Sequence, residues 1–299
     1  MPDGSGLFGY AILGRTGMGN MMFPWARCFV WCKDTGASMI APSWMHLRIG
    51  PYLRREPDKR DYYRLWSGRG YVRGPRRLAA FAMRSRIEER DVTDVRSIPR
   101  GSLVVFRDMP DYFARLRGRH MEVEKEMRRI AKVQLPPVPS SARAAIGIHV
   151  RRGDFSRPPS VESLGTLGHN WQLPIEWYVQ TLRQVRAACG ERLPGKIFSD
   201  GTPEELAPLM REPDTSLVKQ GKATHDMLLL SQCSVIIASG STFSMWASFL
   251  GQRPAVWFPG QLRQRVLGMD GDADAEVEVA LGESLPSRFA ARLHRTLVA

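Results

Sequence analysis

Two adjacent arginines near the middle of the chain, Arg151 and Arg152, are followed by a glycine and Asp154. Guanidinium groups bind phosphate through forked pairs of hydrogen bonds, which lysine reproduces less well. The preceding residues, 144–150, form a short run rich in Ile and Val, and such a run predicts a buried parallel strand. Because ligands of open α/β sheets bind beyond the carboxyl ends of the strands, the arginine pair predicts a phosphate site.

Two ionisable residues flank the arginine pair. Asp154 could remove a proton from a hydroxyl group as a general base, or it could anchor Arg152 and keep the loop rigid. His149 lies in the expected strand. We favour a packing role for this residue over a catalytic role. The segment 156–172 is long enough for a mobile lid, although a surface loop is the simpler interpretation.

A second candidate anion site follows the strand-like run 235–238. Ser241 and Thr242 come directly before an expected helix that begins near Phe243. Hydroxyl groups and backbone N–H groups would converge there on the positive end of the helix dipole. Taken alone, an ordinary Ser/Thr helix cap is the simpler interpretation.

A glycine-rich turn lies between an expected strand, 7–13, and a helix expected to begin near Asn20. Gly14, Gly17 and Gly19 permit positive φ angles and a close approach of the backbone to a ligand. Their spacing matches neither a Walker loop nor G-x-G-x-x-G, so a tight structural turn is an equal alternative.

The elements that must position these loops alternate between strand-like and helix-like segments. This alternation predicts an α/β fold with parallel sheets and helices on both faces. In the second half of the chain, strands are expected at 144–150, 196–199, 216–219, 235–238 and 254–258, and helices at 174–189, 203–210, 226–232 and 243–250. Further strands are expected at 39–41 and 103–106.

A cluster of Pro and Ser at 134–141 interrupts this pattern. Neither a helix nor a central strand tolerates such a cluster, so it predicts two domains, residues 1–135 and 142–299. Two sheet domains that face one another would form a cleft, which is a common place for small-molecule sites.

The formal net charge of +13 indicates an anionic partner. Basic residues are densest at 48–129, but no recognition helix, zinc finger or RNA-recognition signature accompanies them, which argues against a nucleic-acid partner. An anionic bilayer attracts such surfaces by ~1 kcal/mol per Lys or Arg, so peripheral membrane contact is one interpretation. The chain has neither a signal-peptide pattern nor an apolar run of roughly 18–20 residues, and we expect a cytoplasmic protein.

The cysteines show neither metal-ligand spacing nor the density of a disulfide-rich fold. We expect buried core thiols at all four positions, Cys28, Cys32, Cys189 and Cys233.

Several segments, taken in order along the chain, resemble glycosyltransferase family 11, the alpha-1,2-fucosyltransferases, in its bacterial type. Residues 149–155 are similar to the family's H-x-R-R-G-D-[FY], and residues 197–200 to its F-S-D-D. Residues 225–231 and 239–246 are similar to D-x-x-L-M-S and N-S-T-F-S-W-W, and residues 14–23 to G-G-L-G-N-Q-M-F. Residues 48–129 match no motif of the family.

The resemblance implies a GT-B-like fold with two Rossmann-like domains facing a cleft. The N-terminal domain would take the acceptor, and the C-terminal domain would bind the GDP-sugar. The donor would be GDP-fucose, the reaction would invert the fucose anomeric carbon, and no metal or other cofactor would be required. The acceptor would be the O2 hydroxyl of a galactose-like residue at the end of a glycan. The segment 270–274 comes nearest to a metal-binding Asp-x-Asp motif, and we interpret it as a solvated acidic turn.

The resemblance also implies roles for individual residues. As GDP departs, its diphosphate gains negative charge, which Arg151 and secondarily Arg152 would stabilise in place of a metal. Asp226 would accept hydrogen bonds from guanine, and Asp200 would bind ribose or steady the donor loop, although Gly201 replaces the family's second Asp. Given the resemblance, we prefer phosphate binding over simple helix capping as the role of the second candidate anion site, at Ser241 and Thr242. The remaining donor-binding candidates are Ser241, Thr242, Phe243, Gly17, Gly19 and Asn20, and the catalytic candidates are Arg151, Asp154 and His149.

Three alternatives stay open at this point. The enzyme could use another GDP-sugar, or it could attach fucose through another linkage. The chain could instead be a non-catalytic polyanion-binding protein whose basic N-terminal surface is its function. A polyanion binder should lose affinity steeply with salt, whereas a nucleotide site should discriminate GDP from ADP. The sequence predicts no particular oligomeric state.

Overall fold

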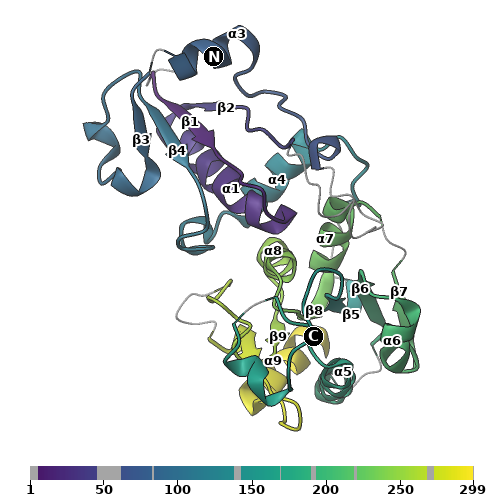
Figure 1. The fold of residues 1–299 in the computed structure, drawn as a ribbon. Helices are drawn as coiled ribbons and strands as arrows, with labels where there is room; N and C mark the ends of the chain where they lie inside the picture. The colour runs from purple at the N-terminus through teal and green to yellow at the C-terminus, as the bar shows by residue number, and fades with distance from the viewer. Residues whose placement is uncertain are drawn as a thin grey trace. The chain divides into compact units, whose positions relative to one another are not determined.

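The chain folds into two compact units, Met1–Gln134 and Leu135–Ala299, in the computed structural model. The structure describes residues 6–45, 62–82, 84–137, 143–168, 170–189, 193–218, 221–267 and 273–298. Each unit contains its own parallel sheet (Figure 1).

The first unit is built on a four-stranded sheet with the order β2-β1-β4-β3. All neighbouring strands pair in parallel. The strands are β1 Phe8–Ala11, β2 Ser38–Ile40, β3 Arg86–Glu88 and β4 Leu103–Phe106. Its α-helices are α1 Met18–Thr35, α3 Gly74–Ala82 and α4 His120–Ile130, and its short 3-10 helices are Tyr62–Arg64, Glu89–Asp91, Val95–Ser97 and Ala114–Leu116.

Side chains alternate between the two faces of β1, as in any strand. Gly9 faces α1, where an added Cβ would overlap the sulfur atoms of Cys32 and Cys28. Phe8 and Tyr10 instead pack in the cluster to which α3 contributes. The first unit is therefore a sheet covered by helices on both sides.

The second unit is built on a six-stranded sheet with the order β10-β9-β8-β5-β6-β7. These strands also pair in parallel throughout. They are β5 Arg143–Val150, β6 Gly195–Ser199, β7 Thr215–Leu217, β8 Cys233–Ile237, β9 Ala255–Trp257 and β10 Glu276–Glu278. The α-helices are α5 Ile175–Cys189, α6 Pro203–Met210, α7 Ala223–Ser231, α8 Thr242–Gly251 and α9 Ser287–Val298, with 3-10 helices at Glu162–Gly165 and Ala273–Ala275.

Strand β5 shows how this second sheet is covered. Ile148 and Val150 point into a core completed by α5, α6 and α9. Gly147 faces the other way and meets Leu230 of α7, and His149 on the same side meets α8. Figure 1 shows α7 and α8 on one side of the sheet and α5 and α9 on the other. This arrangement confirms the α/β fold class with two parallel, Rossmann-like sheets.

Most expected elements occur within a few residues of their predicted positions, and β4 and α6 have the predicted bounds. Four helix starts differ: α1 begins at Met18, α5 at Ile175, α7 at Ala223 and α8 at Thr242. Five elements were not predicted from the sequence: α3, α4, α9, β3 and β10. The two missed strands are three-residue edge strands that contain Arg or Glu, so they lack the apolar run of a buried strand.

Some predictions concern positions outside the described residues. These are Lys219 of the expected third strand, residues 138–141 of the Pro- and Ser-rich break, and Asp270 and Asp272 of the acidic turn. The cysteine prediction is confirmed, since all four thiols are buried and none forms a disulfide. Within the described ranges, no helix is long and apolar enough to cross a bilayer.

Candidate functional site

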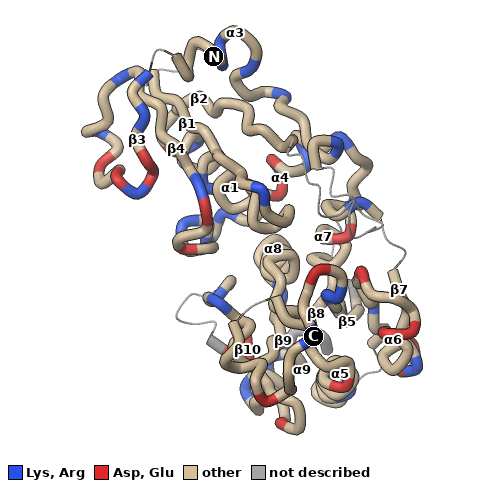
Figure 2. The backbone as a smooth tube through the Cα atoms, in the orientation of Figure 1, with Lys and Arg blue, Asp and Glu red and all other residues tan. Residues whose placement is uncertain are grey.

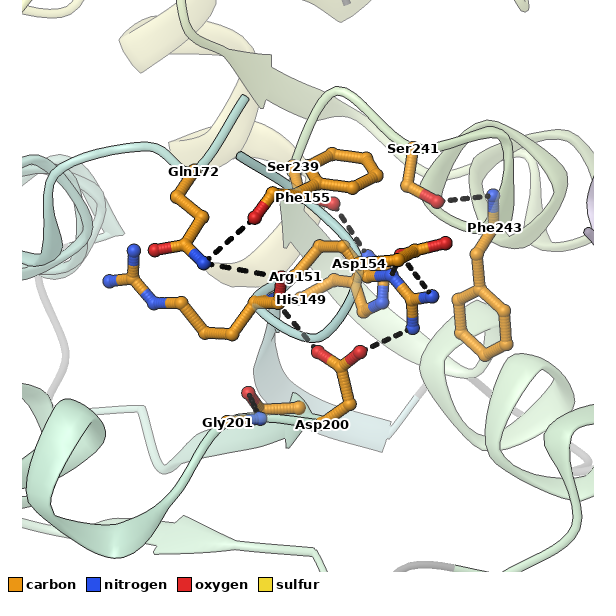
Figure 3. A network of polar contacts seen from close by, with 12 residues as sticks. His149, Arg151, Asp154, Phe155, Gln172, Asp200, Gly201, Ser239, Ser241 and Phe243 are labelled. Carbon is orange, nitrogen blue, oxygen red and sulfur yellow. Dashed lines mark hydrogen bonds and ion pairs between the residues drawn. The ribbon is translucent and has the colours of Figure 1, made fainter. Parts of the chain in front are cut away.

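Arg151 follows the last residue of β5 and binds two carboxylates at once (Figure 3). Its Nη2 and Nε donate to Oδ1 of Asp154 at 2.7 and 3.2 Å. Its Nη1 pairs with Oδ2 of Asp200 at 2.5 Å. The guanidinium is thus held in one orientation at the carboxyl edge of the sheet, where the side chain stays about a quarter exposed (25%).

The two carboxylates leave part of this guanidinium available. A guanidinium has five N–H groups; the hydrogen bonds to Asp154 use two of them, and Nη1 forms an ion pair with Asp200. The other N–H groups lie on the two terminal nitrogens, from which a phosphate could accept. The carboxylates orient the arginine but also offset its charge, so an incoming anion would compete with them for the guanidinium.

Asp200 comes from the end of the neighbouring strand β6. It also supports the backbone of residues 151–154, which we call the arginine loop. Its Oδ1 accepts the backbone N–H of Arg152 at 2.8 Å. An added Cβ at Gly153 would overlap the Asp200 carboxylate, so this close approach depends on glycine. Of the two roles suggested for Asp200, steadying the donor loop matches these contacts, and ribose binding stays a prediction.

The Arg152 guanidinium contacts a backbone carbonyl and not Asp154. Its Nη1 donates to the Leu173 carbonyl at 2.9 Å. The alternative in which Asp154 anchors Arg152 is therefore wrong, because Asp154 binds the neighbouring Arg151. Arg152 has a structural contact, and its secondary role toward phosphate stays a prediction.

The segment that follows the arginine loop is fastened to it at both ends. Gln172 donates from Nε2 to the carbonyl oxygens of Arg152 and Phe155, at 3.3 and 3.0 Å. The backbone N–H of Ser156 donates to the Asn170 carbonyl at 2.9 Å. These bonds close the base of the segment 156–172, for which a surface loop is the simpler interpretation and a lid the alternative.

His149 is buried beneath the site and contacts the loop that leads into α8. Its Nδ1 lies 2.6 Å from Oγ of Ser244 and 2.9 Å from Oγ of Ser239. Its ring stacks on Phe243 with the ring centroids 4.7 Å apart. Burial, followed by the charge of Arg151, lowers the pKa of His149 to about 3. A neutral imidazole of such low basicity is a poor general base at neutral pH, so the geometry favours a positioning role.

The N-terminus of α8 is capped by its own chain. Ser241 is the N-cap residue, and its Oγ accepts the backbone N–H of Phe243 at 3.2 Å. Thr242 is the first helical residue, directly after the β8 loop. The cap interpretation of Ser241 is confirmed, and phosphate binding by Ser241, Thr242 and Phe243 stays a prediction.

The glycine that precedes this cap is required by a buried amide. An added Cβ at Gly240 would overlap Oε1 of Gln261, whose side chain is fully buried. Gln261 in turn donates from Nε2 to the Gly168 carbonyl at 3.0 Å. This glutamine fixes the α8 loop against the segment that follows the arginine loop.

Asp226 lies in the first turn of α7, after strand β7. Both of its carboxylate oxygens lie 3.1 Å from the backbone nitrogen of Gly221, which donates to them. Burial raises the pKa of Asp226, while the Gly221 N–H and the neighbouring His225 act in the opposite direction. These contacts are those of a helix-start carboxylate, and the guanine contact stays a prediction.

The glycine turn belongs to the first unit. Of its glycines, Gly14 has a positive φ of 66°, and Gly17 is the N-cap residue of α1. Gly19 and Asn20 lie inside the helix, because α1 begins two residues earlier than expected. The expectation that Gly19 belongs to the turn is therefore wrong, and donor binding by Gly17, Gly19 and Asn20 stays a prediction.

Several residues that hold this site together were not predicted from the sequence. They are Gln172, Leu173, Ser244, Gln261 and, as a spatial requirement, Gly153. Gly153 had a signal in its place between charged residues of the loop, and Ser244 in its place within the motif at 239–246. The described part of the chain contains no cluster of three or more His, Cys, Asp or Glu side chains arranged to hold a metal ion.

Comparison with known proteins identifies both the family and the fold. The family model "Glycosyl transferase family 11" matches residues 103–258, and comparison with curated protein sequences finds no match. The structure of the NodZ alpha-1,6-fucosyltransferase co-crystallized with GDP matches with a TM-score of 0.50 and 16% sequence identity, over 83% of this chain and 94% of that one. This likeness supports the GT-B-like fold.

Other solved structures match at lower scores. The fucosyltransferase NodZ from Bradyrhizobium has a TM-score of 0.46 and 16% identity, over 84% of this chain and 96% of that one. POFUT1 in complex with GDP has a TM-score of 0.41 and 11% identity, over 85% of this chain and 98% of that one.

The matched region spans more than half of the chain and contains the arginine loop, the segment that ends at Asp200, Asp226 and the start of α8. The glycine turn lies outside it. The resemblance seen in these motifs is confirmed: the protein belongs to glycosyl transferase family 11, the alpha-1,2-fucosyltransferase family.

Proposed function

We propose that the protein transfers L-fucose from GDP-fucose, with inversion, to a hydroxyl group of a glycan acceptor, and that this hydroxyl is O2 of a galactose-like residue. The proposal is based on one arrangement, in which the Arg151 guanidinium contacts the carboxylates of Asp154 and Asp200. We call this arrangement the arginine fork. Arg151 is held by Asp154 and Asp200 at the carboxyl edge of the sheet, and its terminal nitrogens carry further N–H groups. The choice of fucose and of the O2 linkage rests on the family.

The fork suits the charge that develops during transfer. The acceptor oxygen forms a bond to C1 of fucose while the bond from C1 to the GDP oxygen breaks, and the departing diphosphate gains negative charge. Fixed donors that face such charge stabilise the transition state without having to reorganise. Arg151 would supply N–H groups, and the start of α8 would add backbone N–H groups and the Thr242 hydroxyl.

The hydroxyl proton must leave as the new bond forms. Asp154 is our candidate acceptor for it, because it is the carboxylate of the arginine loop and is about one third exposed (32%). In this structure Asp154 forms an ion pair with Arg151, with Oδ1 2.7 Å from Nη2. Binding of phosphate to Arg151 would weaken the pair and make the carboxylate more available.

Selectivity for guanine is assigned to Asp226. A carboxylate can accept from N1–H and N2–H of guanine, whereas adenine offers no matching pair of donors. A site built to pair with these donors discriminates strongly against a base that lacks them. The partial burial of Asp226 would strengthen this discrimination.

The proposal is tested by titrating the purified protein with GDP-fucose, GDP-mannose, GDP and ADP, with and without a chelator. Lactose is then offered as acceptor, and the linkage of the product is determined by NMR. We expect binding selective for guanine, insensitivity to the chelator and transfer to O2 of galactose. Equal binding of GDP and ADP would overturn the donor assignment, and a product linked elsewhere would overturn the linkage.

A non-catalytic polyanion-binding function remains the second candidate, because the net charge is +13. Heparin or another polyanion would then bind with an affinity that falls steeply with salt. Retention of GDP-over-ADP discrimination at high salt would count against this alternative.

A further inference from the structure

The first unit contains a pocket of about 320 Å³ that the donor site does not use. Its lining comes from four stretches of the chain: residues 41–45, residues 63–68, residues 73–77 and Lys132. We call it the tryptophan pocket, after Trp44 and Trp66, whose ring centroids lie 5.3 Å apart. Its volume is at the lower end of the range for small-molecule sites, roughly 300–1,000 Å³.

Backbone hydrogen bonds hold the walls of the tryptophan pocket together. Ala41 donates its N–H to the Val72 carbonyl at 3.0 Å, which joins the first wall to the third. Ser67 donates to Ile130 at 2.7 Å, and Lys132 donates to Leu65 at 2.8 Å. The pocket is thus a built feature of the unit.

The charges around the tryptophan pocket are all of one sign. Among the residues that the structure describes, Arg73, Arg77 and Lys132 line the pocket, and no Asp or Glu does. Arg77 lies over the Tyr10 ring at 5.8 Å, and Lys132 donates to the Tyr63 carbonyl at 3.1 Å. Figure 2 shows basic positions on α3 and on the segment that leads into it. A ligand that matches this charge must be anionic.

The two tryptophans that give the pocket its name are themselves buried. Trp44 and Trp66 are 6% and 2% exposed, and their indole N–H groups have no hydrogen-bond partner within the described ranges. A buried donor without an acceptor is costly. Tyr63, which is 39% exposed, adds a flat apolar surface for the C–H face of a sugar ring.

We propose that the tryptophan pocket binds a negatively charged sugar, bearing a carboxylate or a phosphate, and that this sugar is part of the acceptor glycan. The second half of the proposal rests on the proposed glycosyl transfer. The first half does not, because binding in the pocket needs no donor.

Binding is measured first, without nucleotide, by calorimetry with glucose, glucuronate and glucose 6-phosphate at low and high salt. We expect both anionic sugars to bind at least about 10-fold more tightly than glucose, with an advantage that shrinks as salt rises. The stronger of the two identifies the anionic group. Equal binding of all three sugars would overturn the proposal.

The matched variants are Arg73→Gln and Arg76→Gln. Both arginines are exposed, but only Arg73 lines the pocket. We expect Arg73→Gln to weaken the binding of the anionic sugars by up to about 5-fold, as for a charge at the rim of a binding site. Arg76→Gln should leave this binding unchanged. Equal effects of the two substitutions would refute the assignment of the pocket.

The acceptor role is measured by steady-state transfer to lactose and to lactose that carries a glucuronate or phosphate group on its glucose. We expect a lower KM for the charged acceptor, and a smaller ratio of charged to neutral kcat/KM in Arg73→Gln. Anion-selective binding combined with equal KM values would overturn the acceptor role alone. Failure of all transfer would count against the proposed function, and the calorimetry would still decide whether the pocket binds an anionic sugar.

Discussion

Replacing Arg151 with lysine keeps its positive charge and removes its fork. The guanidinium contacts Asp154 through Nη2 and Nε, and Asp200 through Nη1. A lysine carries its three N–H donors on one nitrogen, so it cannot span both carboxylates and also donate twice to a phosphate. The substitution therefore separates the geometry of the site from its charge.

The expected loss of activity follows from the donors removed. Deleting one preorganised donor to developing negative charge lowers kcat by about 10²–10³-fold, or roughly 2.7–4 kcal/mol. We expect Arg151→Lys to lose about 10²-fold in kcat, and Arg151→Ala to lose at least about 10³-fold. The two ion pairs are a quarter to a third exposed, so each contributes at most about 1 kcal/mol to stability. Activity should therefore fall far more than the melting temperature.

The assay is steady-state fucose transfer, with thermal unfolding measured on the same preparations. Arg183→Lys is the matched control, because Arg183 forms a comparable fork with Glu212 on the exposed surface of α5. We expect the control to keep its activity. If Arg151→Lys stayed within about 5-fold of the parent kcat, the fork would not be the source of transition-state stabilisation.

Three further substitutions test the surroundings of this fork. Gly153→Ala should lower kcat/KM by at least about 10-fold, because its methyl group would displace Asp200. Gly165→Ala is the control, since it adds a methyl group where no neighbour lies within 4 Å. Equal kinetics in the two variants would contradict this packing argument. Asp226→Asn should weaken the binding of GDP by roughly 10-fold or more in a calorimetric titration, since a charge-assisted hydrogen bond contributes about 1.5–3 kcal/mol. The binding of ADP should stay nearly unchanged, and parallel losses for both nucleotides would exclude the guanine role. His149 has a folded-state pKa of about 3, below its unfolded value of about 6.5, so its contribution to stability is present above pH 6.5 and is lost as the pH falls toward 3. Urea unfolding should therefore show the parent losing about 2 kcal/mol between pH 7 and pH 5 through this group, a loss that His149→Gln should lack, and identical pH slopes would refute the argument.

Much of the fold was readable from the sequence because its signals are local. Alternating apolar runs and helix starts predicted the parallel sheets, and the bounds of β4 and α6 matched. Signals weakened at the edges of the sheets. The three-residue strands β3 and β10 carry Arg and Glu, so they become strands only because a neighbouring strand offers them hydrogen bonds.

The candidate site shows the same division between local and distant information. The position of Arg151 after a strand is a local fact, and it was sufficient to single out the arginine loop. The match of Ser241 to a helix cap is local as well. Family motifs then linked these loops to one another, although they carry no information about which side chains touch.

The tertiary structure alone decided which distant side chains meet. Asp200 reaches Arg151 because β6 lies beside β5, and His149 reaches Ser244 because β8 lies on the other side of β5. The tryptophan pocket likewise depends on separate stretches of the first unit that only folding brings together. The sequence by itself determined where strands end and helices begin, because those preferences act over a few residues. The pairing of carboxylates, arginines and indoles depends on strand order and on close packing, which no short window of sequence contains.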